Sequence, residues 1–508
     1  MKTTHTHKFF EVVRSLELFK HVIQAIRTSL SIGKFVFTPL YCRCLMYIGY
    51  SAIFVVLFAS TSFSDVKLPD IFAPGMVLQR GLPVPVWGWA DPQEKITVTI
   101  NEQSQTTETN ADGYWQVQLK PLQAGKPTKL IIKGKNEIVL ENILIGEVWL
   151  CSGQSNMEWS MNKHPDSKAD VPSVNNPNIR LFQVRHETAG KPQNRLTPNI
   201  VWQPANPKSV GNFSSIGYYF GEKLNAELGV PIGLIDSSWG GTRIEPWTPV
   251  VGFKSVPSLA SLADVKLPAN PRNDKPTALY NKMIHPLVPL AIRGSIWYQG
   301  EANLTDGMQY AEKMKALING WRKVFNNDEL GFYYVQLAPF KYGAAPTFLP
   351  RVWEAQAVVE KQLNKTGMVV INDIGNINDI HPRNKKIVAD RLAAQALNKS
   401  YGKKDIACES PKFDKIIIDG AAVIVNFIDV KEFKTRDGKS PSWFEIAGSN
   451  GEYHKAEATI VDKTKIKLTS SNVANPVNVR FAWHQIAEPN LQNEAGLQLG
   501  AFRTDKEN

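Results

Sequence analysis

The feature that most constrains the fold is the alternation of apolar strand-like runs with amphipathic helix-like runs through residues 142–403. Runs such as "EVWLC" (147–151) and "GSIWYQG" (294–300) are separated by helical segments. In the first long helix Ser214 is placed to cap the start, and Gly229 is placed to end it. This order predicts a parallel sheet with helices on both faces and reactive groups beyond the carboxyl ends of its strands.

On both sides of this α/β region the hydrophobic pattern changes to period two, which is typical of β-strands. Before it, "KITVTI" (95–100) and "YWQVQL" (114–119) alternate, and the turn at Asp112–Gly113 predicts a hairpin. After it, "KIIIDGAAVIVNF" (415–427) predicts a hairpin around Asp419–Gly420. The predicted organisation is a leader at 1–64, a β-sandwich at 65–141, the α/β core at 142–403 and a second β-domain at 404–508.

The leader contains the apolar stretch "LMYIGYSAIFVVLF" (45–58), with basic residues before it and small residues after it. This pattern resembles a secretory signal with a long N-terminal region, and cleavage after Ser64 fits it. The stretch is short for a spanning helix, although an uncleaved membrane anchor is the alternative. We therefore expect the body of the protein to be exported, to the periplasm or outside the cell.

Charge and cysteine content exclude several classes of protein. The net charge is +11, but the first 64 residues hold seven Lys/Arg and two acids, and the remaining charge is dispersed. No basic run or nucleic-acid motif is present, so nucleic acid is not an expected partner. After the leader, Cys151 and Cys408 are the only thiols, and they are expected to be small core residues rather than a disulfide framework.

Four polar stretches follow strands of the predicted sheet. "LCSGQSNMEW" carries Ser155 between amides, "SWGGTRIEPW" carries Gly240 and Gly241, "WYQGEAN" carries Gln299, and "NDIHPRNK" carries His381 immediately before Pro382, a favourable first helical residue. Together they suit acyl transfer, in which a serine attacks, a histidine takes its proton, and N–H groups stabilise the oxyanion. The position two residues after the serine is Met157, not the glycine of an α/β-hydrolase elbow.

With "YNKMIHPLVP" between the second and third, these stretches resemble the sialate O-acetylesterase family of SGNH-type hydrolases, from about residue 65 to the end. The resemblance implies a three-layer α/β/α SGNH-hydrolase core that removes O-acetyl groups from sugars without a metal or organic cofactor. It also implies that Ser155 is the nucleophile and His381 the base. The implied oxyanion donors are the Ser155 N–H, one of Gly240 and Gly241, and the Gln299 side chain.

Each assignment has a structural alternative. The paired glycines alone would suit a tight turn, Gln299 could cap its strand, and Glu301 is expected to be structural. His285 is interpreted as a hydrogen-bonded core histidine. Gln154 and Arg243 are predicted to contact substrate, Arg243 through a carboxylate, although an ion pair within the protein is an equal alternative for its guanidinium.

The acid is where this sequence departs from the SGNH pattern. That pattern has an aspartate three residues before the histidine, where this chain has Asn378, and Asp379 stands one residue later. We expect Asp379 to accept the ring N–H of His381. The competing hypothesis is a dyad in which a backbone carbonyl orients the ring and Asp379 caps a helix.

The predicted function is an exported, metal-independent carbohydrate O-acetylesterase acting on O-acetylated sialic acids, with no stable protein partner. An esterase for acetylated plant polysaccharides such as xylan would use the same catalytic residues. A glycan-binding protein with an inactive hydrolase core is the alternative from another class.

Overall fold

The computed structural model describes residues 65–505. The predicted leader with its signal-like segment falls at residues 1–64, outside this range. Within the described residues, no helix has both the length and the apolar character needed to span a membrane.

The centre of the molecule is a largely parallel sheet with the strand order β13-β12-β11-β7-β10-β8-β9. All neighbours in this series pair in parallel except β8 and β9 at one edge. The parallel sheet predicted from the alternating pattern is therefore confirmed. Its strands are β7 (Glu137–Gly153), β8 (Asn176–Gln183), β9 (Gln203–Ala205), β10 (Ile232–Ser238), β11 (Gly294–Tyr298), β12 (Gly331–Val335) and β13 (Thr366–Val369).

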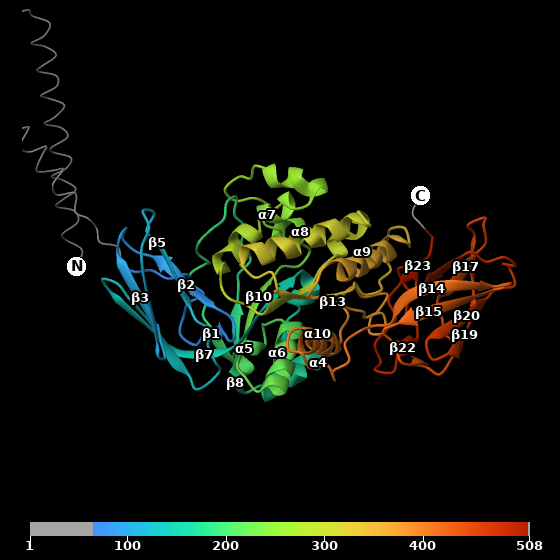
Figure 1. Ribbon diagram of the computed structural model, residues 1–508, viewed down its shortest axis with the longest axis horizontal. Coiled ribbons are helices and arrows are strands. Elements are labelled where there is room, and N and C mark those ends of the chain that lie inside the picture. Colours follow the sequence, from blue (N-terminus) through green and yellow to red (C-terminus); the bar gives the residue numbers. More distant parts are fainter. Residues whose placement is uncertain (1–64, 506–508) are drawn as a thin grey trace, which may run out of the picture. The chain divides into compact units, whose positions relative to one another are not determined.

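Helices cover both faces of this sheet, with α8 and α9 on one side and α6 and α10 on the other (Figure 1). In α6 the Ser214 side chain accepts the Gly217 N–H, and Gly229 ends the helix in the left-handed conformation, as predicted. The helices are α3 (Ser155–Glu158), α4 (Pro165–Asp170), α5 (Pro207–Val210), α6 (Ser215–Leu228), α7 (Val250–Lys254), α8 (Gln309–Val324), α9 (Phe348–Gln362) and α10 (Lys385–Lys399).

Strand β7 joins the N-terminal β-strands to the central sheet. Its first half pairs with β6 and β1, and its second half pairs with β10 and β11. The predicted boundary between residues 141 and 142 falls inside this strand, so the domain division stays a prediction. The N-terminal strands are β1 (Val77–Gln79), β2 (Val84–Trp89), β3 (Lys95–Ile100), β4 (Gln103–Glu108), β5 (Tyr114–Leu119) and β6 (Thr128–Lys133).

The hairpin predicted at Asp112–Gly113 is wrong. Strand β4 before this turn pairs with β3, whereas β5 after it pairs with β2 in a separate two-stranded sheet. The reason is packing: β5 directs Trp115, Val117 and Leu119 into the hydrophobic core, and all three are buried. The chain therefore crosses to another sheet at this turn instead of returning along β4.

The C-terminal region is β-rich. The hairpin predicted around Asp419–Gly420 is confirmed, because β14 and β15 pair in antiparallel register up to Asp419 and Ala422. Cys151 and Cys408 are free and buried, as expected of small core residues. The strands are β14 (Lys412–Asp419), β15 (Ala422–Ile428), β16 (Phe433–Thr435), β17 (Phe444–Ala447), β18 (Tyr453–Lys455), β19 (Glu457–Asp462), β20 (Lys465–Thr469), β21 (Asn478–Phe481), β22 (Leu491–Asn493) and β23 (Phe502–Arg503).

Candidate active site

Ser155 lies at the carboxyl end of the central strand β7. The strand ends at Gly153, whose φ of +138° favours glycine, and a Cβ there would lie 2.2 Å from the carbonyl oxygen of Tyr298. Only glycine fits this close approach of two backbones. The chain then turns, and Ser155 becomes the first residue of α3. This turn leaves the serine partly exposed at the sheet edge where the sequence predicted it.

The structure brings Ser155 and His381 together. The Nε2 atom of His381 lies 2.9 Å from Ser155 Oγ, within hydrogen-bonding distance. Burial lowers the pKa of His381, and the nearby Lys385 ammonium lowers it further, so the imidazole is neutral at physiological pH. A neutral imidazole with Nε2 facing a hydroxyl is the arrangement needed for proton transfer from serine.

His381 does not stand at the first turn of the last helix. The sequence placed Pro382 at its first position, but α10 begins at Lys385, and the Asn384 side chain accepts the Ile387 N–H as its cap. Asparagine is a strong N-cap and therefore fixes the start at this point. His381 and Pro382 accordingly belong to the loop before α10.

The side chains of Asp379 and His381 lie within ion-pair distance, but no hydrogen bond joins them in this arrangement. Oδ1 of Asp379 lies 3.8 Å from Nδ1 of His381, beyond hydrogen-bonding distance. The same oxygen accepts the backbone N–H of His381 at 3.0 Å. Asn378 is exposed, and among the described residues no carbonyl accepts a hydrogen bond from Nδ1. Asp379 thus stabilises the loop through this backbone hydrogen bond, and the choice between a triad and a dyad stays a prediction.

Trp159 positions His381 and was missed in the sequence. Its ring stacks on the imidazole with centroids 4.5 Å apart and an angle of 29° between the planes. The Lys163 ammonium lies 4.9 Å from the same indole centroid. Stacking limits rotation of the imidazole where no hydrogen bond to Nδ1 does so. In the sequence, the only indication that Trp159 lies near the site is its position four residues after Ser155.

A largely buried polar cluster, formed by Asn156, Glu301 and Lys385, lies next to Ser155 and His381. The Asn156 amide donates to Glu301 Oε1 at 2.7 Å, and Asn156 Oδ1 accepts from Lys385 Nζ at 2.5 Å. Burial lowers the pKa of Lys385 to about 7 and raises that of Glu301. Asn156 also donates to the carbonyl of Ile380, next to the base. The cluster therefore ties the loop of His381 to the residue after Ser155. Glu301 takes part in it, and its structural role stays a prediction.

Gly240 and Gly241 lie beyond strand β10, beside the serine. A Cβ on Gly240 would lie 3.2 Å from Ser155 Cβ and 3.1 Å from Glu158 Oε2, so glycine allows this close approach. The Gly240 N–H donates to Glu158 Oε2 at 2.6 Å. Among the described residues none accepts a hydrogen bond from the Gly241 N–H. The sequence did not single out Glu158, which was visible only as the acid three residues after Ser155.

The Gln299 side chain is fully buried and already engaged. Its Nε2 atom lies 2.8 Å from Asn303 Oδ1, 3.1 Å from the Thr242 carbonyl and 3.2 Å from Gln154 Oε1. Tyr310 donates to its oxygen. Two amide hydrogens thus face three protein acceptors, which leaves none for an oxyanion in this structure.

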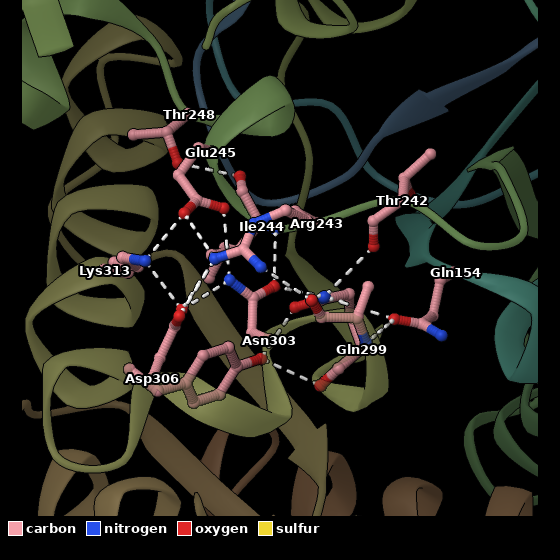
Figure 2. A network of polar contacts seen from close by, with 12 residues as sticks. Gln154, Thr242, Arg243, Ile244, Glu245, Thr248, Gln299, Asn303, Asp306 and Lys313 are labelled. Atoms are coloured by element: carbon pink, nitrogen blue, oxygen red, sulfur yellow. Dashed lines mark hydrogen bonds and ion pairs between the residues drawn. The ribbon is translucent and has the colours of Figure 1, made fainter. Parts of the chain in front are cut away.

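Gln154 has the opposite arrangement to Gln299, because within the described residues its side-chain oxygen is engaged and its amide hydrogens are not. Its side-chain oxygen faces the network (Figure 2), where Gln299 and the backbone N–H groups of Gly300 and Ala302 donate to it. Backbone donors fix which end of the amide is oxygen. Among the described residues none accepts from Gln154 Nε2, so the amide beside the nucleophile keeps free N–H groups.

Arg243 belongs to an ion network rather than to an open site. Its guanidinium contacts Glu245 at 3.1 Å and Asp306 at 2.9 Å, and it donates to the Ala302 carbonyl at 2.8 Å. Lys313 bridges the same two carboxylates (Figure 2). Although burial opposes it, Lys313 and then Arg243 hold the pKa of Glu245 at about 2. Of the two alternatives for Arg243, the structure shows the ion pair.

The Nδ1 atom of His285 lies 3.0 Å from the carbonyl of Gln193, so the expected hydrogen bond is present, but the side chain is half-buried and does not lie in the core. Within residues 65–505, His, Cys, Asp and Glu side chains form no group of three or more that could hold a metal ion.

A family model described as "Carbohydrate esterase, sialic acid-specific acetylesterase" matches residues 145–398, which is half of the chain. Human sialate O-acetylesterase is 28% identical over 446 residues, covering 78% of this chain and 83% of that protein. The crystal structure of a carbohydrate acetylesterase from Xanthomonas citri is 37% identical with a TM-score of 0.80, covering 87% of this chain and 100% of that one.

Proposed function

Because the chain belongs to the carbohydrate esterase family of sialic acid-specific acetylesterases and is an esterase, we propose that Ser155 removes O-acetyl groups from sugars through a covalent acetyl-enzyme. The observation that carries this proposal is the 2.9 Å contact between Ser155 Oγ and His381 Nε2. A glycan-binding protein with an inactive core has no need of this contact.

In the first half-reaction, Ser155 Oγ forms a bond to the acetyl carbon while its proton moves to His381 Nε2. The carbonyl oxygen becomes negative, and the bond to the sugar oxygen then breaks as Nε2 returns the proton to that oxygen. In the second half, a water molecule attacks the acetyl carbon while its proton moves to Nε2. The bond between Ser155 Oγ and the acetyl carbon then breaks as Nε2 returns the proton to Oγ, which releases acetate and free Ser155.

For the oxyanion, we propose the backbone N–H of Ser155 and that of Gly240 or Gly241. The Ser155 N–H is the first of helix α3 and has no intrahelical acceptor. Gln154 fits the side-chain contact to the substrate better than Gln299, because its amide hydrogens are unengaged. Gln299 then acts through Gln154 as a positioning residue.

O-acetylated sialic acid is the proposed substrate, supported by the family description and by the names of the mammalian relatives. An acetylated neutral polysaccharide such as xylan is the second candidate. It is favoured by one observation: Arg243, the residue expected to hold a substrate carboxylate, is already paired with Glu245 and Asp306.

The test is acetate release from O-acetylated N-acetylneuraminic acid and from acetylated xylan, with the parent chain and Ser155→Ala. We expect Ser155→Ala to lose nearly all turnover while its thermal unfolding midpoint stays that of the parent. Turnover near the parent level in this variant would sink the serine mechanism. The ratio of kcat/KM for the two substrates decides between them.

We also propose export, because the leader combines basic residues, an apolar stretch and small residues before Asp65. Expression of the full chain in a Gram-negative host, followed by mass measurement of the periplasmic product, tests this. A product starting near Asp65 supports cleavage, whereas full-length protein in the membrane fraction supports an anchor, and full-length protein in the cytoplasm contradicts export.

A further inference from the structure

We propose that a cavity between strands β2 and β5 and the end of helix α8 is a second carbohydrate site, which binds a neutral sugar residue away from the catalytic dyad. The cavity measures about 320 Å³. Sites of small molecules in proteins are about 300–1,000 Å³ and often lie where separate structural layers meet. The proposal does not depend on the mechanism of Ser155.

One wall of the cavity is aromatic. Trp87 and Trp89 are two residues apart on β2 and therefore point to the same face of the strand. Tyr114 on β5 stands directly opposite Trp89, so all three lie on one face of the two-stranded sheet. The Trp89 and Tyr114 rings are only half-buried, with centroids 6.4 Å apart in an edge-to-face arrangement. Half-exposed aromatic rings in a concavity offer a flat surface for the apolar C–H face of a pyranose.

The opposite wall carries polar groups with unused hydrogen-bonding capacity. His285 Nδ1 faces the carbonyl of Gln193, which can only accept, so Nδ1 carries the hydrogen. Burial lowers the pKa of His285, so the ring is neutral and Nε2 is left as an acceptor. Among the described residues none hydrogen-bonds to Nε2 or to the side chains of Asn194 and Asn326.

The charge of the lining selects the class of ligand. The residues around this cavity include no Asp, Glu, Lys or Arg. An anionic sugar or a phosphate would lose its hydration there without gaining an opposite charge. Neutral hydroxyl groups, by contrast, suit an imidazole acceptor and two amides. The lining therefore fits a neutral sugar residue of an oligosaccharide or polysaccharide, which would hold a polymeric substrate on the enzyme.

The experiment uses the full chain with two neutral, unacetylated probes, xylohexaose and lacto-N-tetraose, in isothermal titration calorimetry. We expect at least one probe to bind, and Trp89→Ala to weaken that binding by about tenfold or more, as for a buried aromatic anchor. Asn194→Ala, at an exposed position, should weaken it by a smaller factor. Trp443→Ala is the matched control, because Trp443 is also half-buried and does not line the cavity.

Hydrolysis of 4-nitrophenyl acetate should be unchanged in Trp89→Ala, which shows that the fold and the dyad are intact. Failure of both probes to bind at millimolar concentration overturns the proposal. So does binding that Trp89→Ala and Asn194→Ala leave unchanged, since the probes would then occupy another site, such as the catalytic one. Loss of 4-nitrophenyl acetate turnover in Ser155→Ala tests only the catalytic proposal and leaves this one untouched.

Discussion

Replacement of Asp379 by asparagine separates a catalytic acid from a loop-stabilising one. In a triad this change lowers kcat by about 10⁴-fold, because the imidazole takes the wrong tautomer. Here the carboxylate lies 3.8 Å from Nδ1, with both side chains a quarter to a third exposed. Two unit charges at that distance in water interact by only about 1 kcal/mol, and salt screens them further. We therefore expect Asp379→Asn to lower kcat by less than about tenfold.

The same change should alter the pH profile. The negative charge of Asp379 raises the pKa of His381, so its removal lowers that pKa. The neutral base then persists to lower pH, and the acid limb of kcat/KM moves to lower pH. Measurement of 4-nitrophenyl acetate hydrolysis across pH, with Asn378→Ala as the neighbouring control, checks both expectations. A fall in kcat of several powers of ten in Asp379→Asn alone would refute the dyad.

Stability gives a third readout. Asparagine keeps a side-chain oxygen for the backbone N–H of His381, whereas alanine does not. Asp379→Ala should therefore cost about 0.5–2 kcal/mol in urea unfolding, the usual value of a lost cap, and Asp379→Asn should cost less. Equal losses in the two variants would mean that the hydrogen bond at 3.0 Å contributes little to stability.

Three further outcomes follow from the buried polar groups around the site. Gln299→Ala should lower stability by about 1–3 kcal/mol as well as kcat, because it leaves buried partners of the Gln154 network unpaired; full stability with reduced kcat alone would restore Gln299 as an oxyanion donor. Lys385→Met should move the acid limb of kcat/KM to higher pH, since the Lys385 ammonium lowers the pKa of His381; an unmoved limb would contradict this. Lys313→Met should cost about 3–5 kcal/mol in urea unfolding with KM unchanged, because it leaves buried carboxylates with one cation fewer; a raised KM with parent stability would assign the network to substrate binding.

The sequence predicts the fold where a local pattern determines the structure. The alternation of strands and helices gives the parallel sheet, and the caps at Ser214 and Gly229 bound α6 correctly. The hairpin at Asp112–Gly113 fails because a turn signal says that the chain reverses but not which strand it joins. That choice depended on burying the apolar face of β5 in the hydrophobic core.

The candidate site shows the same limit. Spacing places Ser155 and His381 at one edge of the sheet, and the structure brings them into contact, although His381 lies in the loop before α10 and not at the helix start. The spacing of residues in the sequence cannot show in which direction a hydrogen-bond donor points. The Gln299 amide points into the protein because Asn303, four residues later, supplies an acceptor. Arg243 forms ion pairs with Glu245 and Asp306, which come from separate segments. Such contacts arise only after the chain has folded.

The two glycines beyond β10 are equivalent in the sequence but not in the structure. Gly240 lies so close to Ser155 that a Cβ there would be only 3.2 Å from the serine Cβ, yet its N–H is bound to the Glu158 carboxylate at 2.6 Å. For Gly240 to donate to an oxyanion, Glu158 must first turn away, and its side chain, 27% exposed, has solvent to turn into. A carboxylate left in place would also repel the developing negative charge. Gly241, whose N–H has no acceptor in the described part of the chain, requires no such movement. Proximity to Ser155 therefore favours Gly240 as the oxyanion donor, whereas an unengaged N–H favours Gly241. We propose Gly241, because its amide requires no movement of Glu158.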